Sequence, residues 1–185
     1  EGNGVPADGD LWVSYSVNKE DMWISRIPVP VEINASAHAD DDFSKNKSIA
    51  ELTDWNIYSP VWAPVSLEDQ WLKLQDKDPF DYAKVERKIP ASKELKVSFD
   101  LKAGQNNKGT LQIEFLDENG IACSRIELTD DGIFRLKGGS RFANMMKYEA
   151  GKVYHVEAVL STVDRNIQVY VDGKRVGLRM FYAPV

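Results

Sequence analysis

Three aspartates stand close together at Asp76, Asp78 and Asp81, the spacing of an oxygen-rich loop. Carboxylate oxygens are the ligands that calcium prefers, so these residues are the candidate metal site. The alternative is an exposed turn opened by Asp78-Pro79, with Asp81 capping the next residues of the chain. The glycine and distal glutamate of the common calcium loop are absent. The run Asp40–Asp42 is assigned to a solvated loop rather than to a ligand site.

A second group of residues suggests sugar recognition. Aromatic rings stack on the apolar faces of pyranoses while neighbouring polar groups bind the hydroxyls. Trp55, Tyr58, Trp62 and Trp71 are therefore the candidate ligand-binding residues. The alternative is that these rings seal the junction between an N-terminal hairpin and the rest of the chain, held by a proline-containing strap.

Glycoside hydrolysis requires two carboxylic acids on either side of one bond. The pairs Glu114 with Asp117 and Glu127 with Asp130 do not match the Glu-x-Asp-x-x-Glu spacing of sandwich glucanases. We therefore predict no catalytic residue in this chain. The only cysteine is Cys123, which we assign to strand packing; no internal disulfide or cysteine-rich zinc site is available to it.

His155 alternates with an apolar face, so we expect it to point outward. The net charge of −6 and the pI near 5.0 argue against a nucleic-acid partner and an anionic membrane surface, which need clustered basic residues. No segment is long and apolar enough to span a membrane. The first residues lack the features of a signal peptide.

The second half of the chain predicts an all-β, antiparallel sandwich. Residues 167–171 alternate in polarity, and Asp172-Gly173 supplies a tight primed turn into a return strand. Similar turn signals recur at regular spacing, whereas residues 141–148 are expected to form a looser loop. The other expected strands cover residues 95–101, 110–116, 122–128, 133–137 and 153–160.

The first third is less regular. Residues 11–17 and 22–27 predict a hairpin that ends at Pro28, because proline cannot donate to the ladder. Residues 38–48 predict a polar loop, and residues 48–52 a turn of helix. Residues 55–65 are expected to be extended chain across a surface.

The hairpin Leu11-Trp-Val-Ser-Tyr-Ser-Val-Asn-Lys-Glu-Asp-Met-Trp-Ile-Ser-Arg-Ile-Pro-Val-Pro30 resembles the closing blade of sialidase-like (BNR-repeat) β-propellers from bacterial polysaccharide-degrading systems. The segments Trp55–Trp62, Asp76–Tyr82 and Tyr170–Lys174 resemble the sandwich domain that follows such propellers, whose fold is similar to concanavalin A-like lectins and glucanases and to laminin G domains. The resemblance implies two parts: residues 1–33, a terminal propeller-type hairpin with linker, and residues 34–185, the β-sandwich.

The same resemblance implies a larger, exported glycoside hydrolase of sialidase-like form as the parent protein. Its catalytic arginine triad would lie in blades outside this chain. For the chain itself we expect a non-catalytic domain that binds carbohydrate or braces the propeller, so the expected partner is a glycan or the propeller. The alternatives are a structural interaction domain without ligand and a small glycoside hydrolase. No cofactor is expected apart from calcium.

Overall fold

The computed structural model describes residues 10–17, 21–28, 39–117 and 119–181. It divides the chain into two compact units, Glu1–Pro90 and Ala91–Val185. The boundary predicted between residues 33 and 34 falls outside the described residues and stays a prediction. Within the described ranges, no helix has the length and apolar character needed to cross a membrane.

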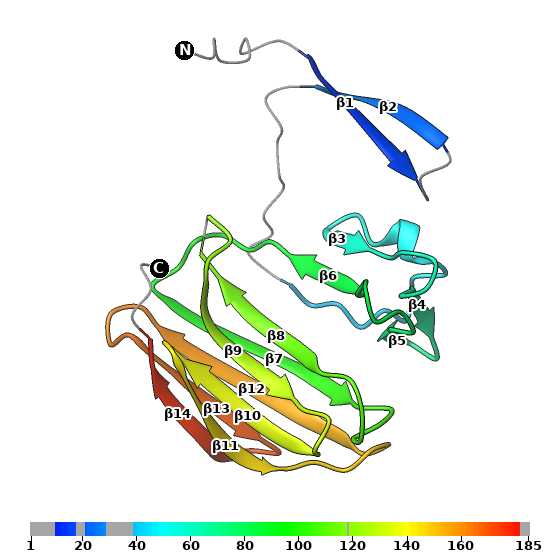
Figure 1. Cartoon of the computed structure of the whole chain (residues 1–185). Coiled ribbons are helices and arrows are strands. Elements are labelled where there is room, and N and C mark those ends of the chain that lie inside the picture. Colours follow the sequence, from blue (N-terminus) through cyan, green and yellow to red (C-terminus); the bar gives the residue numbers. More distant parts are fainter. Residues whose placement is uncertain (1–9, 18–20, 29–38, 118, 182–185) are drawn as a thin grey trace. The chain divides into compact units, whose positions relative to one another are not determined.

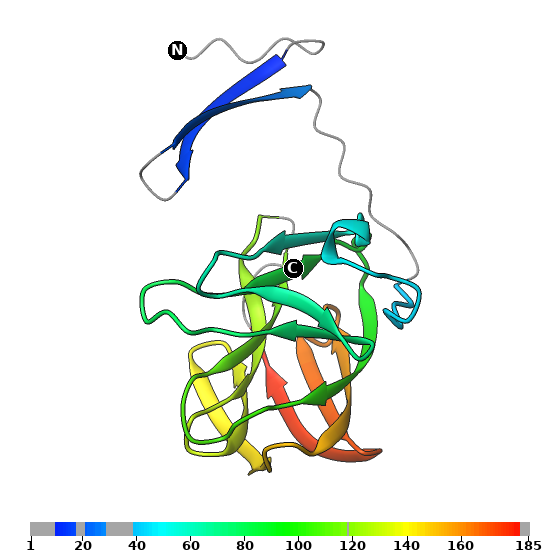
Figure 2. The ribbon, with the colours of Figure 1, turned by 90° about the vertical axis from the view of Figure 1, so that its right-hand side faces the viewer.

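The unit Ala91–Val185 is built from two antiparallel four-stranded sheets, which form two layers in Figure 2. One sheet has the order β11-β10-β9-β8, with bounds Arg141–Lys147, Ile133–Gly138, Ala122–Leu128 and Leu111–Leu116. The other has the order β14-β13-β12-β7, with bounds Lys174–Met180, Asn166–Val171, Val153–Ser161 and Glu94–Lys102. The predicted all-β sandwich is confirmed (Figure 1).

The core of this unit follows from the period-two alternation of its strands. On β12 the buried positions alternate with more exposed ones, which places His155 on the outer face as predicted. Phe181 follows β14, is fully buried, and donates its N–H to the Arg165 carbonyl at 2.9 Å. The largest fully buried core side chains are Tyr154, Phe134, Phe181, Ile126, Leu128, Leu136, Ile167, Val156 and Val169.

The hairpin between β13 and β14 has the predicted geometry. Asp172 and Gly173 both have positive φ, at 50° and 76°, as a primed two-residue turn requires. By contrast, the loop expected over residues 141–148 is wrong: Arg141–Lys147 is strand β11, paired antiparallel with β10. A register shift between Phe134 and Arg135 breaks the alternation that would have identified it.

In the unit Glu1–Pro90, β1 (Asp10–Val17) and β2 (Asp21–Pro28) form the predicted hairpin. A short 3₁₀ helix, η1, covers Ile49–Glu51 within the expected helical turn.

The extended segment predicted over residues 55–65 is only partly correct, because strands and a turn divide it. Strand β3 (Trp55–Tyr58) pairs with β6 (Lys84–Arg87), and β4 (Val65–Glu68) pairs with β5 (Trp71–Leu74).

Candidate functional site

The four predicted aromatic residues divide into two half-buried and two exposed rings. Trp55 and Trp71 are half-buried. The Trp55 ring lies 6.0 Å from that of Phe43, and the guanidinium of Arg87 lies 5.9 Å from its centre. Tyr58 and Trp62 keep 47% and 66% of their surface exposed. Tyr58 and Trp62 therefore offer more ring surface to a ligand such as a sugar than Trp55 and Trp71 do.

Trp62 is exposed on a backbone that is well fixed. Its carbonyl accepts the Lys77 N–H at 2.9 Å, and the Ala63 N–H donates to the Pro60 carbonyl at 3.1 Å. Ser59 Oγ accepts the Val65 N–H at 2.8 Å, which ties the turn to the start of β4. A ring carried on such a turn is held in place before a ligand arrives, which lowers the ordering cost of binding.

Tyr58, at the end of β3, belongs to a small aromatic and acidic cluster. Its ring centre lies 5.4 Å from that of Tyr82, and its hydroxyl donates to Asp81 Oδ1 at 3.0 Å. This hydrogen bond to a carboxylate raises the pKa of Tyr58 above its usual range, because it favours the neutral phenol. Phe80, 96% exposed, precedes the cluster.

Phe80 and Tyr82 were not among the predicted binding residues. The available signal was the segment Asp78-Pro-Phe-Asp-Tyr82, in which two large aromatic side chains stand within a polar turn. Together with Tyr58 and Trp62 they give the unit four exposed aromatic side chains within residues 58–82. We call these four residues the aromatic set.

The predicted calcium ligands are engaged in local turns. Asp76 Oδ1 accepts the Asp78 N–H, and Asp78 Oδ1 accepts the Phe80 N–H, both at 2.9 Å. Asp81 Oδ1 accepts hydrogen bonds from the Tyr58 hydroxyl and from the Tyr82 N–H. Within the ranges that the structure describes, no group of three acidic, histidine or cysteine side chains is arranged to hold a metal ion. Calcium binding by these residues stays a prediction.

Three of the four carboxylates considered for catalysis are bound by neighbouring groups. Glu114 accepts the Arg125 Nε–H at 2.7 Å. Glu127 is only 2% exposed and binds Arg125 and Arg135. Asp117 Oδ1 accepts hydrogen bonds from the Asn119 and Ile121 N–H groups in the turn that follows it. These side chains stabilise the sheet of β8–β11 and its turns.

Cys123 and His155 behave as the sequence predicts. Cys123 is buried on β9, and this burial raises the pKa of its thiol, which disfavours the nucleophilic thiolate. His155 is exposed, with Nδ1 2.8 Å from Asp100 Oδ1.

The described chain thus contains an antiparallel β-sandwich in one unit and four exposed aromatic side chains in the other. The sequence model of the family described as "Sialidase-like, CBM domain" matches residues 55–185. The chain belongs to this family of sialidase-like carbohydrate-binding modules.

A solved structure named "Sialidase" is 91% identical to the chain, with a TM-score of 0.86. The match covers 100% of this chain but 17% of that one, so the chain spans a small part of its relative's length. No curated protein matches the chain. The sialidase-like resemblance expected from the sequence is thus confirmed.

Proposed function

We propose that this chain is a non-catalytic carbohydrate-binding module of an exported, glycan-degrading protein of sialidase-like form. The observation that carries the proposal is the family match over residues 55–185, which includes the whole sandwich and the aromatic set. The relative named "Sialidase" supports a larger parent, because this chain corresponds to 17% of its length. The module brings the enzyme to its glycan while the chemistry takes place elsewhere in the parent.

The aromatic set supplies the glycan-binding surface of this proposal. Trp62 offers a fixed, exposed indole, and Tyr58 stands beside the carboxylate of Asp81. Flat rings with adjacent acceptors suit neutral sugars, whose C–H faces stack while their hydroxyls donate.

A bracing role is a second function, favoured by the hairpin β1–β2. Its register places Trp12, Met22 and Ile24 on one face, and all three are exposed. A two-stranded hairpin that leaves three large apolar side chains exposed is marginally stable in water on its own. Further strands from a BNR-type propeller in the parent protein would pair with the hairpin to complete a blade, and the neighbouring blade would cover this face.

A glycan array probed with the 185-residue chain, in calcium and again with chelator, tests the binding role. Trp62→Ala should weaken binding roughly 2- to 10-fold through lost stacking. Trp12→Ala removes an equally exposed indole outside the matched residues and serves as the matched control. Loss of binding with chelator, reproduced by Asp78→Asn, would assign calcium to the acidic turn.

Two results would contradict the proposal of glycan binding through the aromatic set. One is an array without signal under both conditions, which would leave only the bracing role. The other is an equal effect of Trp62→Ala and Trp12→Ala, because a binding surface at the aromatic set requires Trp62 to matter more.

A further inference from the structure

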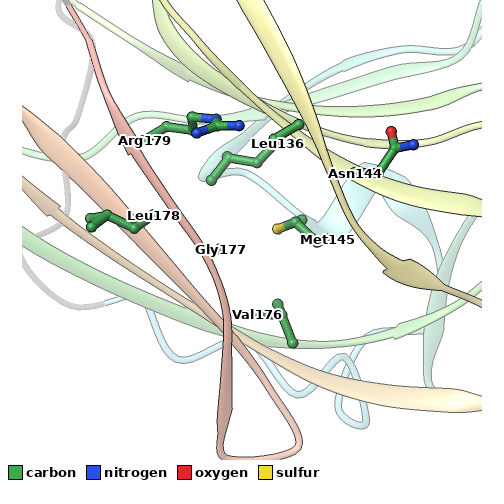
Figure 3. A pocket seen from close by; sticks show the side chains of 8 residues that line it. Leu136, Asn144, Met145, Val176, Gly177, Leu178 and Arg179 are labelled. Carbon is green, nitrogen blue, oxygen red and sulfur yellow. The ribbon is translucent and has the colours of Figure 1, made fainter.

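Strand β14 packs unusually closely against the edge of the facing sheet, along a seam with β10 and β11. A Cβ on Gly138 would lie 2.5 Å from the Met180 carbonyl oxygen, and one on Gly177 would lie 2.5 Å from Met145 Sδ. Only glycine leaves room for backbones at this separation. Figure 3 shows Met145 of β11 facing Gly177 of β14 across the seam, with Arg179 directed toward Leu136.

A hollow of about 560 Å³ opens at one end of this seam, between the β10–β11 turn and the end of β14. Its volume falls within the range of about 300–1,000 Å³ that is usual for small-molecule sites. It is lined by Gly138, Ser140, Arg141, Phe142, Arg179 and Met180. The lining thus contains two guanidinium groups, one aromatic ring and no carboxylate.

Among the residues that the structure describes, the two arginines of the hollow have no counter-ion. Arg179 Nε is buried without a hydrogen-bond partner. Throughout the described ranges, no carboxylate lies within ion-pair distance of Arg179 or Arg141. Elsewhere on the same unit, Arg125 and Arg135 are both paired with glutamate. A partly desolvated cation without a partner is unfavourable, and a bound anion would offset that cost.

A third cation, Lys137, lies beside Phe142, one of the residues that line the hollow. Its ring is 39% exposed, and Lys137 Nζ lies 5.4 Å from its centre. The guanidinium of Arg135 lies 4.4 Å from the same ring. Lys137 has no carboxylate partner in the described part of the chain. Because Arg135 is paired with Glu127, Lys137 is the unbalanced cation beside this ring, in a protein whose net charge is −6.

We propose that this hollow is a second binding site, separate from the aromatic set, and that it takes a sugar residue carrying a carboxylate. The guanidinium groups of Arg141 and Arg179 bind the carboxylate, a geometry for which arginine is better suited than lysine. Phe142 packs against the sugar ring. The aromatic set consists of uncharged rings, whereas the hollow contains two arginines. The aromatic set should therefore prefer neutral sugars and the hollow acidic ones.

Isothermal titration of the 185-residue chain with N-acetylneuraminic acid and with D-glucuronic acid tests this site. Both acids should bind, more weakly at high ionic strength. Arg141→Gln should lower the affinity by about 10-fold or more, the usual effect of losing a charge-assisted hydrogen bond. Arg141 is exposed, so this variant should fold normally even if Arg179→Gln does not. Arg175→Gln, an exposed arginine on β14 outside the hollow, should change nothing.

Galactose and acetate are the control ligands of this titration. Equal binding of galactose at this site would overturn the role of charge, and acetate binding as tightly as the acids would overturn the assignment to a sugar. Equal affinities in Arg141→Gln and Arg175→Gln would overturn the location. If neither acid binds while the array still detects glycans that depend on Trp62, this inference fails and the proposed function stands.

Discussion

Arg135 on β10 donates its Nε–H to Oε2 of Glu127 on β9 at 2.7 Å, and Glu127 is only 2% exposed. The two residues are directly opposite in the ladder. The other carboxylate oxygen of Glu127 accepts hydrogen bonds from Gln112 and Arg125, at 3.2 and 3.3 Å. One buried carboxylate thus links three strands on the face of the sheet opposite the core.

Replacing this carboxylate should destabilise the sandwich. Glu127→Gln keeps the shape but removes the charge that Arg125 and Arg135 require, so the free energy of unfolding should fall by about 1.5–3 kcal/mol. Glu114→Gln is the control, because its more exposed pair with Arg125 should contribute only about 0.2–1 kcal/mol. Urea denaturation of both variants measures the difference. Equal losses would show that the burial of Glu127 does not matter.

The seam glycines should differ in their tolerance of alanine. Gly138→Ala forces a Cβ against the Met180 backbone, so it should cost about 1–3 kcal/mol. Gly177→Ala meets the flexible Met145 side chain and should cost less. Gly104, with open space around it, is the control. Thermal unfolding ranks the three variants.

The Met145 contact also allows a double-mutant test. In the Gly177→Ala background, Met145→Ala removes the Sδ and Cγ atoms that crowd the new Cβ. The double variant should therefore be more stable than the sum of the two single effects predicts. Simple additivity would mean that Met145 is not the obstacle at this position.

The Tyr58–Asp81 hydrogen bond should appear in an alkaline titration. Since the pKa of Tyr58 is raised in the folded chain, its contribution to stability is fully present below the unfolded pKa and is lost as the pH rises through the folded value. Asp81→Asn should bring the pKa of Tyr58 down toward its ordinary value. NMR of labelled tyrosines follows the Tyr58 ring directly. An unchanged pKa in Asp81→Asn would contradict the role of this bond.

The sequence predicted the sandwich well where alternation was uninterrupted. Residues 95–101 alternate without interruption, and every inward position of residues 153–160 is apolar; both segments proved to be strands. Strand β11 was missed because Arg-Phe-Ala-Asn-Met-Met-Lys has no period of two, and it pairs across a register shift. The short strands β3–β6 were also difficult, because β3 pairs with a strand that is distant in the sequence.

The candidate sites were predictable only in part. The aromatic residues stand out by type, but sequence alone does not distinguish the exposed Trp62 from the half-buried Trp55. The seam hollow combines residues from β11 and β14, and no local pattern connects them. One signal was present: Gly177 interrupts an otherwise apolar and basic strand, and a glycine inside a strand often marks a close backbone approach.

The strand order β14-β13-β12-β7 has a consequence for synthesis of the protein. β7 leaves the ribosome well before β12, its partner in the sheet, and Phe181 emerges after every strand of the unit. Until β12 emerges, β7 has no partner strand in its own sheet, so Leu95, Phe99 and Leu101 stand on an unpaired strand. The nascent sandwich therefore closes late, since its long-range pairings require large loops to form first. During this interval the apolar side chains of β7 are most accessible to a chaperone.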